Sequence, residues 1–198
     1  TAGLENHSDL YEVALMLINH LIWKRLKEDR SRRMFILEDE FAMQLKNPYA
    51  TAVADEISRT APKYGAAFWL ISQSLKDFDN PVARALLTNT TFHLFYPTPS
   101  EEHFIQDLFE LPDHTMQLYR TLGGHIGDYR EALLMIRKES GVKEGGVVVV
   151  RPTPKTYWAY TTHNREVAMK EKVIAKYGGD IEAALDELAR EYPKGVQT

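Results

Sequence analysis

Met34-Phe35-Ile36-Leu37-Glu38-Asp39-Glu40 is the stretch of sequence that decides the fold. It begins with a short apolar run, and three acidic residues follow directly. A run that short, placed after a helical segment and a charged turn, is typical of a buried strand in a parallel sheet. The stretch therefore predicts a strand that carries carboxylates at its carboxyl end.

Helical and extended patterns alternate around this strand. Asp9 and Glu12 precede apolar residues at helical spacing, which predicts a helix from there to about Leu26. Further along, the pattern predicts a helix over 49–60, a strand over 66–72, a helical segment over 82–87 and a strand over 92–96. Strands that alternate with helices indicate an α/β fold with a mostly parallel sheet flanked by helices.

The second half of the chain predicts short helices and a hairpin. Helices are expected over 100–109 and 113–122, from Asn164 to the glycine pair 178–179, and from Asp180 to Pro193. The β-prone runs 132–136 and 147–150, with glycines between them, predict an antiparallel hairpin, and 157–160 is expected to be one more strand. No linker rich in Pro, Gly or Ser divides the sequence, so residues 1–198 are expected to form one domain.

The composition argues against several kinds of site. The chain has no cysteine, which excludes disulfides, thiolate metal sites and cysteine nucleophiles. Its seven histidines show no H-x-H or H-E-x-x-H spacing, which argues against a zinc site. The formal net charge of −4 does not support nucleic-acid binding. No apolar run approaches the roughly 18 to 20 residues that cross a bilayer, and no signal-peptide pattern is visible at the start.

The acids after the first strand are candidates for nucleotide chemistry. In open α/β sheets, ligands bind beyond the carboxyl ends of the strands. There one acid can hold Mg²⁺, directly or through its water shell, and its neighbour can orient or deprotonate an attacking water. On this interpretation Asp39 binds the metal ion, and Glu40 orients or deprotonates the attacking water. Glu38 competes for either role, because the sequence does not show which of the three acids point inward.

A second polar group follows the next predicted strand. In FWLISQS, Ser72, Gln73 and Ser74 end an apolar run, on the same expected sheet edge as Asp39 and Glu40. A glutamine there can hydrogen-bond both a phosphate oxygen and the attacking water. The simpler interpretation is that these residues only terminate the strand.

Taken together, these motifs resemble a known family. The segments are FILEDEFAMQL (35–45), ADEISRTAPKYG (54–65), AFWLISQSLKDF (67–78), LLTNTTFHLFYP (86–97), YWAYTTHNREVAMKEKVIAKYG (157–178) and ALDELAREYPKGV (184–196). In content and order they are similar to the VirB-type ATPases of type IV secretion and conjugative transfer, also called the TrbE, TraC or CagE family. The resemblance covers essentially the whole chain and implies a RecA-like P-loop NTPase domain.

The resemblance also implies roles for individual residues. Asp39 and Glu40 match the Walker B pair, with Asp39 on Mg²⁺, and Gln73 matches the sensor glutamine. The family's basic arginine-lysine-tyrosine motif here reads Pro62-Lys63-Tyr64. Lys63 therefore matches a phosphate contact, and Arg59, three residues before Pro62, is the candidate to replace the missing arginine. Further arginines that could contact phosphate across a subunit interface, unranked, are Arg84, Arg120 and Arg130.

The implied function is ATP hydrolysis that drives machine assembly or substrate transport. The family resemblance implies ATP and Mg²⁺ as cofactors, a homo-oligomer, expected to be a hexamer, and a cytoplasmic location peripheral to the bacterial inner membrane, with other secretion components as partners. The alternatives are a DNA-translocating coupling protein of the same fold and a non-hydrolysing structural subunit. No G-x-x-x-x-G-K-[ST] loop occurs in the sequence. It is expected upstream of Thr1, and these residues alone are expected to be inactive.

Overall fold

The computed structural model describes residues 8–29, 31–138 and 143–196. The segment Thr1-Ala2-Gly3-Leu4, which the family resemblance places just after an earlier strand, lies outside the described residues. The described chain divides into two compact units. The first contains the residues up to 91 together with 100–111, and the second contains 92–99 and the residues from 112 onward.

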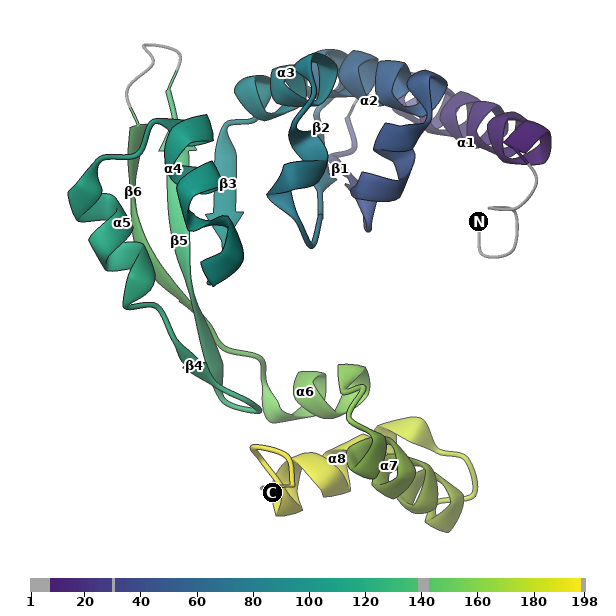
Figure 1. The fold of residues 1–198 in the computed structure, drawn as a ribbon. Helices are drawn as coiled ribbons and strands as arrows, with labels where there is room; N and C mark the ends of the chain where they lie inside the picture. The colour runs from purple at the N-terminus through teal and green to yellow at the C-terminus, as the bar shows by residue number, and fades with distance from the viewer. Residues whose placement is uncertain (1–7, 30, 139–142, 197–198) are drawn as a thin grey trace. The chain divides into compact units, whose positions relative to one another are not determined.

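The first unit is built around a two-stranded parallel sheet (Figure 1). Its elements are α1 (Ser8–Glu28), β1 (Met34–Glu38), η1 (Phe41–Lys46), α2 (Pro48–Thr60), η2 (Ala61–Tyr64), β2 (Ala66–Leu70), η3 (Leu75–Phe78), α3 (Pro81–Asn89) and α4 (Glu102–Phe109). β1 and β2 pair in parallel from Met34 opposite Ala66 to Glu38 opposite Leu70. The parallel pairing of these two strands, joined by a helix, confirms the prediction made from their sequences.

One face of this sheet is covered and the other is open. Leu26 from α1 and Ile57 from α2 form a buried cluster against which Met34, Ile36 and Phe68 pack. On the opposite face Phe35, Leu37 and Trp69 are exposed, and the rings of Phe35 and Trp69 meet edge to face at 6.0 Å. Because successive side chains of a strand point to opposite faces, the apolar run supplies both the covered face and the open one.

The second unit contains an antiparallel sheet followed by three helices. Its elements are β3 (Phe92–Phe95), α5 (Asp113–Arg120), β4 (Gly124–His125), β5 (Tyr129–Arg137), β6 (Lys143–Val150), α6 (Pro154–Tyr160), α7 (Asn164–Lys176) and α8 (Ile181–Glu191), and η4 (Pro99–Glu101) lies where the chain passes between the units. β3, β4 and β6 each pair antiparallel with β5. The β5–β6 pairing confirms the predicted hairpin, whose Gly141 lies outside the described residues.

The described residues do not form the mostly parallel sheet that the sequence predicted. β3 had the pattern of a third parallel strand, but it pairs antiparallel with β5, Phe92 opposite Ile136 and Phe95 opposite Leu133. A short apolar run indicates a strand, but it does not specify which strand lies beside it, and Phe92 and Leu94 of β3 are in fact exposed. The α/β class stands, with one parallel pair and one antiparallel sheet.

The segment predicted as a strand over 157–160 is helical, so that prediction was wrong. It forms the end of α6, whose first residue is Pro154 and whose N-cap is Thr153. The Thr153 hydroxyl oxygen accepts a hydrogen bond from the Thr156 N–H at 3.1 Å, and the fixed φ of proline suits the first turn of a helix. These start signals outweigh the aromatic residues, whose β preference depends strongly on context.

α2 begins with a strong side-chain cap. The Asn47 Oδ1 accepts hydrogen bonds from the N–H groups of Tyr49, at 2.9 Å, and Ala50, at 3.0 Å, and Pro48 follows as the first helical residue. Asn47→Ala should therefore lower the free energy of unfolding by about 1 kcal/mol, because two helix N–H groups lose their acceptor. Urea unfolding of the two proteins would measure this difference. An unchanged midpoint would contradict the role of the cap.

Candidate functional site

The carboxyl ends of β1 and β2 are held together by backbone hydrogen bonds. The N–H of Ile71 donates to the carbonyl oxygen of Glu38 at 2.9 Å, and the N–H of Phe41 donates to the carbonyl oxygen of Ile71 at 3.0 Å. The residues that follow each strand therefore lie side by side. The candidate site predicted from the sequence lies at this edge of the sheet.

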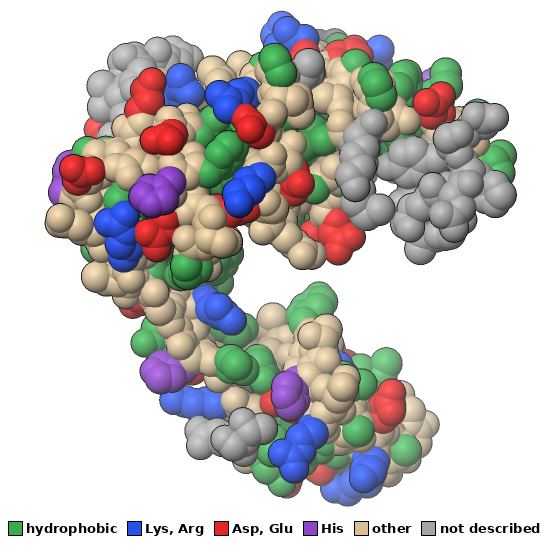
Figure 2. Space-filling model, viewed as in Figure 1, with side chains coloured by type: hydrophobic (Ala, Val, Ile, Leu, Met, Phe, Trp, Pro, Cys, Tyr) green, Lys and Arg blue, Asp and Glu red, His purple; other side chains and the backbone are tan. Residues whose placement is uncertain are grey.

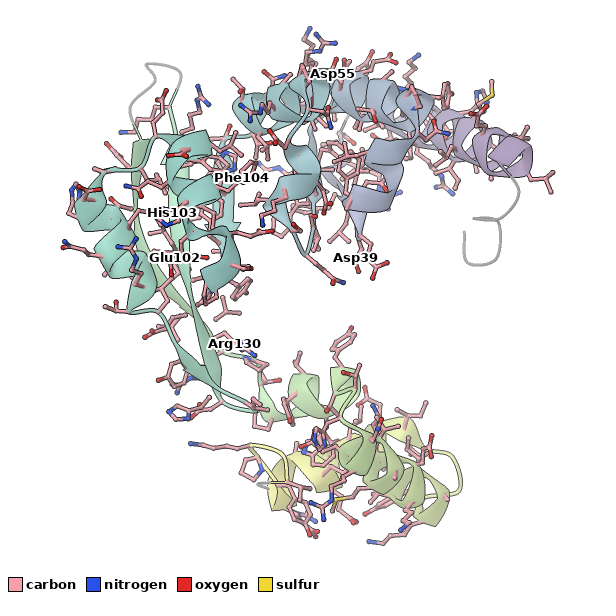
Figure 3. All side chains as sticks on the ribbon, in the orientation of Figure 1. Asp39, Asp55, Glu102, His103, Phe104 and Arg130 are labelled. Atoms are coloured by element: carbon pink, nitrogen blue, oxygen red, sulfur yellow. The ribbon has the colours of Figure 1, made fainter. Side chains whose placement is uncertain are left out.

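The three acids after β1 have different surroundings. Glu38 is half-buried, and its Oε2 accepts a hydrogen bond from Gln44 Nε2 at 2.6 Å. Asp39 is exposed, and its Oδ1 accepts from the N–H of Glu40 at 2.9 Å. Figure 2 shows acidic side chains at the surface where Figure 3 labels Asp39. Of the three acids, Glu38 is thus already engaged by the protein, whereas Asp39 and Glu40 face solvent.

Glu40 and Gln73 meet although they are far apart in the sequence. Gln73 Nε2 donates a hydrogen bond to Glu40 Oε1 at 3.4 Å, and both side chains are exposed. The distance is long for a hydrogen bond. The pair therefore presents a carboxylate and an amide together at one edge of the sheet.

Glu40 has an unusual backbone conformation. Its φ is 51° and its ψ is 40°, which is the left-handed region that non-glycine residues rarely adopt. The conformation costs about 1 to 2 kcal/mol for a residue with a Cβ. It turns the chain sharply between the last residue of β1 and η1, and it leaves the Glu40 carboxylate facing solvent. Backbone strain of this kind is often found at functional sites.

The turn that carries Gln73 is anchored from another part of the chain. Ser74 Oγ donates a hydrogen bond to Glu101 Oε1, and the N–H of Leu75 donates to Glu101 Oε2 at 2.9 Å. Glu101 is only 6% exposed. The sequence reasoning missed this residue, because an acid beside Ser100 at the start of a helix reads as part of a helix cap.

The two basic candidates lie at the opposite end of the strands. Arg59 lies in the last turn of α2 and forms an ion pair with Asp55, and Lys63 lies in η2, just before β2. Gln73 follows the other end of β2, and a five-residue strand is roughly 16 Å long. The structure therefore does not bring Arg59 and Lys63 to the Glu40–Gln73 pair. Their contact with the nucleotide, or with its phosphate across a subunit interface, stays a prediction.

The other three candidate arginines lie in three different elements of the chain. Arg84 lies in α3 and forms an ion pair with Asp79. Arg120 ends α5, and Arg130, labelled in Figure 3, lies in β5, so both belong to the second unit. Within the described residues of the first unit, no contact favours any of the three arginines as the one that binds phosphate.

The site is compatible with a metal ion that binds together with the phosphates of a nucleotide. Within the described residues, no group of three or more His, Asp or Glu side chains is arranged to hold a metal ion. Mg²⁺, however, is commonly held by one or two carboxylates together with substrate phosphates and water. The exposed carboxylate of Asp39 matches that arrangement, whereas a metal held by protein ligands alone would need more of them.

Comparison with known proteins supports the fold. No family model matches the chain, and no curated protein matches it. Among solved structures, the structure of VirB4 of Thermoanaerobacter pseudethanolicus is similar, with 24% sequence identity and a TM-score of 0.54. The similarity covers 72% of this chain and 38% of that chain, so the 198 residues span well under half the length of the protein they resemble.

The class that these observations define is an α/β protein with polar groups at the carboxyl edge of a parallel strand pair. More specifically, the chain has a VirB4-like fold. In the part of the chain that the structure describes, no helix is both long enough and apolar enough to span a membrane.

Proposed function

We propose that this chain is part of an energising ATPase of a type IV secretion or conjugative transfer system, with a RecA-like P-loop NTPase domain. The observation that carries the proposal is the hydrogen bond between Gln73 and Glu40, which unites the two motifs that the family resemblance selects. The VirB4-like fold supports it as well. On this proposal, the edge beyond β1 and β2 is where the terminal phosphate of ATP is attacked by water.

The geometry suits this chemistry. The exposed Glu40 carboxylate can accept the proton of a water molecule that attacks the γ-phosphate. The Gln73 side chain, already within reach of Glu40, can donate to a phosphate oxygen and accept from the same water. The β1–β2 pairing and the hydrogen bonds just beyond it hold the two backbone segments that carry these groups side by side, which would help to position them for the reaction.

Asp39 is the residue proposed to hold Mg²⁺. When bound there, the ion would neutralise charge that develops during phosphoryl transfer. Asp39→Asn should raise the Mg²⁺ concentration needed for half-maximal hydrolysis by about tenfold or more, because the site loses a negative ligand. Magnesium titration of steady-state ATPase activity measures this, with Asp107→Asn, an exposed aspartate on α4, as the matched control. An identical magnesium dependence in both variants would exclude Asp39 from the metal site.

The test of the function uses the longest product of the open reading frame that contains this sequence. Hydrolysis needs a phosphate-binding loop, and these 198 residues contain none. Steady release of phosphate from Mg·ATP supports the proposal. ATP binding without release would instead indicate the non-hydrolysing structural subunit. Salt-dependent DNA binding that stimulates hydrolysis would indicate the DNA-translocating alternative.

The oligomeric state and the cellular location are also part of the proposed function. We expect a homo-oligomer, a hexamer, on the cytoplasmic side of the bacterial inner membrane, in contact with other secretion components. The exposed apolar face of the β1–β2 pair, with Phe35, Leu37 and Trp69, supports further packing of this unit against protein surface. Light scattering with and without ATP would determine the number of subunits.

A further inference from the structure

Glu101 is a buried carboxylate that does not cap the helix it precedes. It occupies the N-cap position of α4, yet no side-chain cap hydrogen bond is formed there. Instead its two oxygens accept from Ser74 Oγ and from the N–H of Leu75. Both donors are neutral groups, and both belong to the turn that follows β2.

This turn is held on both sides of Gln73. Ser72 Oγ donates to the carbonyl oxygen of Ser74 at 3.0 Å. Ser74 Oγ in turn accepts from the N–H of Lys76 at 3.3 Å and so caps η3, which begins at Leu75. Gln73 is therefore the exposed residue between two anchored serines. The Gln73 side chain points toward Glu40. Its direction depends on the backbone of the turn, which Glu101 holds through the N–H of Leu75.

Burial of this carboxylate is costly. A buried charge is unfavourable unless it is paired and fully hydrogen-bonded, and the hydrogen bonds of Glu101 come from neutral donors. Replacing Glu101 alone would leave the Ser74 hydroxyl and the N–H of Leu75 without their acceptor, so some loss of stability is expected. The role of Glu101 in the geometry of the turn is therefore tested by kinetic readouts and by a conservative variant, not by stability alone.

We propose that Glu101 is a positioning residue that holds the Ser72-Gln73-Ser74 turn so that Gln73 faces the attacking water. The inference rests on the proposed ATPase function. It also connects the turn to α4, which begins directly after Glu101; Figure 3 labels the neighbouring Glu102 on that helix. Glu101, α4 and the turn that carries Gln73 all belong to the first unit.

The test compares Glu101→Ala and Glu101→Gln in the full-length protein. Glu101→Ala should lower kcat for ATP hydrolysis about 10²-fold with KM within about twofold, since misplacement of a catalytic group by about 1 Å has an effect of that size. Glu101→Gln keeps an acceptor oxygen and should recover most of the loss. The control is Glu56→Ala, an exposed glutamate on α2 in the same unit, which should leave kcat unchanged.

A second readout does not depend on turnover. Hydrogen–deuterium exchange of the peptide that contains Gln73 to Lys76 should accelerate about tenfold in Glu101→Ala and remain unchanged in Glu56→Ala, because the N–H of Leu75 loses its acceptor. Unchanged exchange would overturn the inference, and so would faster exchange with an unchanged kcat. If the wild-type protein hydrolyses no ATP, the proposed function fails, while the exchange experiment still decides whether Glu101 holds the turn.

Discussion

Glu40→Gln should lower ATP turnover by about 10²- to 10⁴-fold and leave ATP binding intact, because a proton acceptor contributes a factor of that size. Glutamine preserves the shape of the side chain and an oxygen that can accept from Gln73 Nε2. It cannot take a proton from water. Phosphate release under steady-state conditions, measured beside equilibrium binding of a fluorescent ATP analogue, separates the two effects. Glu56→Gln, on the exposed side of α2, is the matched control.

Glu40→Gly separates catalysis from backbone strain. Glycine adopts a positive φ without the cost of about 1 to 2 kcal/mol that a Cβ incurs, although it loses about 0.5 to 1 kcal/mol through its greater freedom in the unfolded chain. The free energy of unfolding should therefore stay the same or rise by up to about 1.5 kcal/mol, while turnover falls as in Glu40→Gln. A large loss of stability in Glu40→Gly would contradict the strain at this position. Full turnover in Glu40→Gln would remove Glu40 from the proposed role and leave Glu38 as the competing acid.

The second large effect is expected at Glu166 in α7. This carboxylate is 3% exposed and accepts hydrogen bonds from the Tyr157 hydroxyl at 2.8 and 2.9 Å, from the Thr161 hydroxyl and from the N–H of Val196 at 2.9 Å. It thus joins α6, the following turn and the C-terminal segment. Glu166→Ala leaves three half-buried donors without an acceptor and should destabilise the α6–α8 helices by about 3 kcal/mol, roughly 1 kcal/mol for each donor.

Hydrogen exchange measures this loss directly. Amides of α6 and α8 should exchange about 10²-fold faster or more in Glu166→Ala, because each 1.4 kcal/mol of lost stability corresponds to a factor of about ten in the opening equilibrium. Glu171→Ala, an exposed glutamate on the same helix, should leave the exchange unchanged. Equal protection in the two variants would show that Glu166 does not hold the helices together.

The same carboxylate gives these helices a pH dependence. Burial alone would raise the pKa of Glu166, but the hydrogen bonds from Thr161, Tyr157 and Val196 outweigh burial and hold its pKa below the ordinary value. A carboxyl group with a lowered pKa in the folded state stabilises that state fully at pH values above its unfolded pKa, about 4.3 for glutamate. The stabilisation is lost as the pH falls from there through the folded pKa. Glu166→Gln should therefore show a weaker acid-induced loss of stability than the wild-type protein between about pH 5 and 3.

Much of the local structure could be predicted, and so could the edge that carries the candidate site. The apolar runs at Met34–Glu38 and Ala66–Leu70 form a parallel pair joined by a helix, as their patterns indicate. Because the side chains that follow parallel strands meet at one edge, Asp39, Glu40 and Gln73 could be placed together without a structure. Their chemical roles remain predictions.

The partners of later elements could not be predicted in this way. β3 looks like β1 and β2 in sequence but pairs antiparallel with β5, and the residues Tyr157–Tyr160 form a helix despite their β-prone aromatic side chains. Strand pairing depends on contacts between distant segments, and aromatic residues suit either a strand or a buried helix face. Neither choice is encoded in the period of the local pattern.

By itself, the sequence determined most of the helices and strands, the exception being 157–160, and which polar residues follow the strands, because periodicity and strand ends are local properties. The tertiary structure alone decided three features of the site: that Glu38 is engaged by Gln44, that Glu40 adopts a left-handed backbone, and that Glu101 reaches the turn of Gln73 from 26 and 27 positions away. Each of these depends on the direction of a side chain or a backbone turn after packing. Such directions are set by the neighbours that folding brings together.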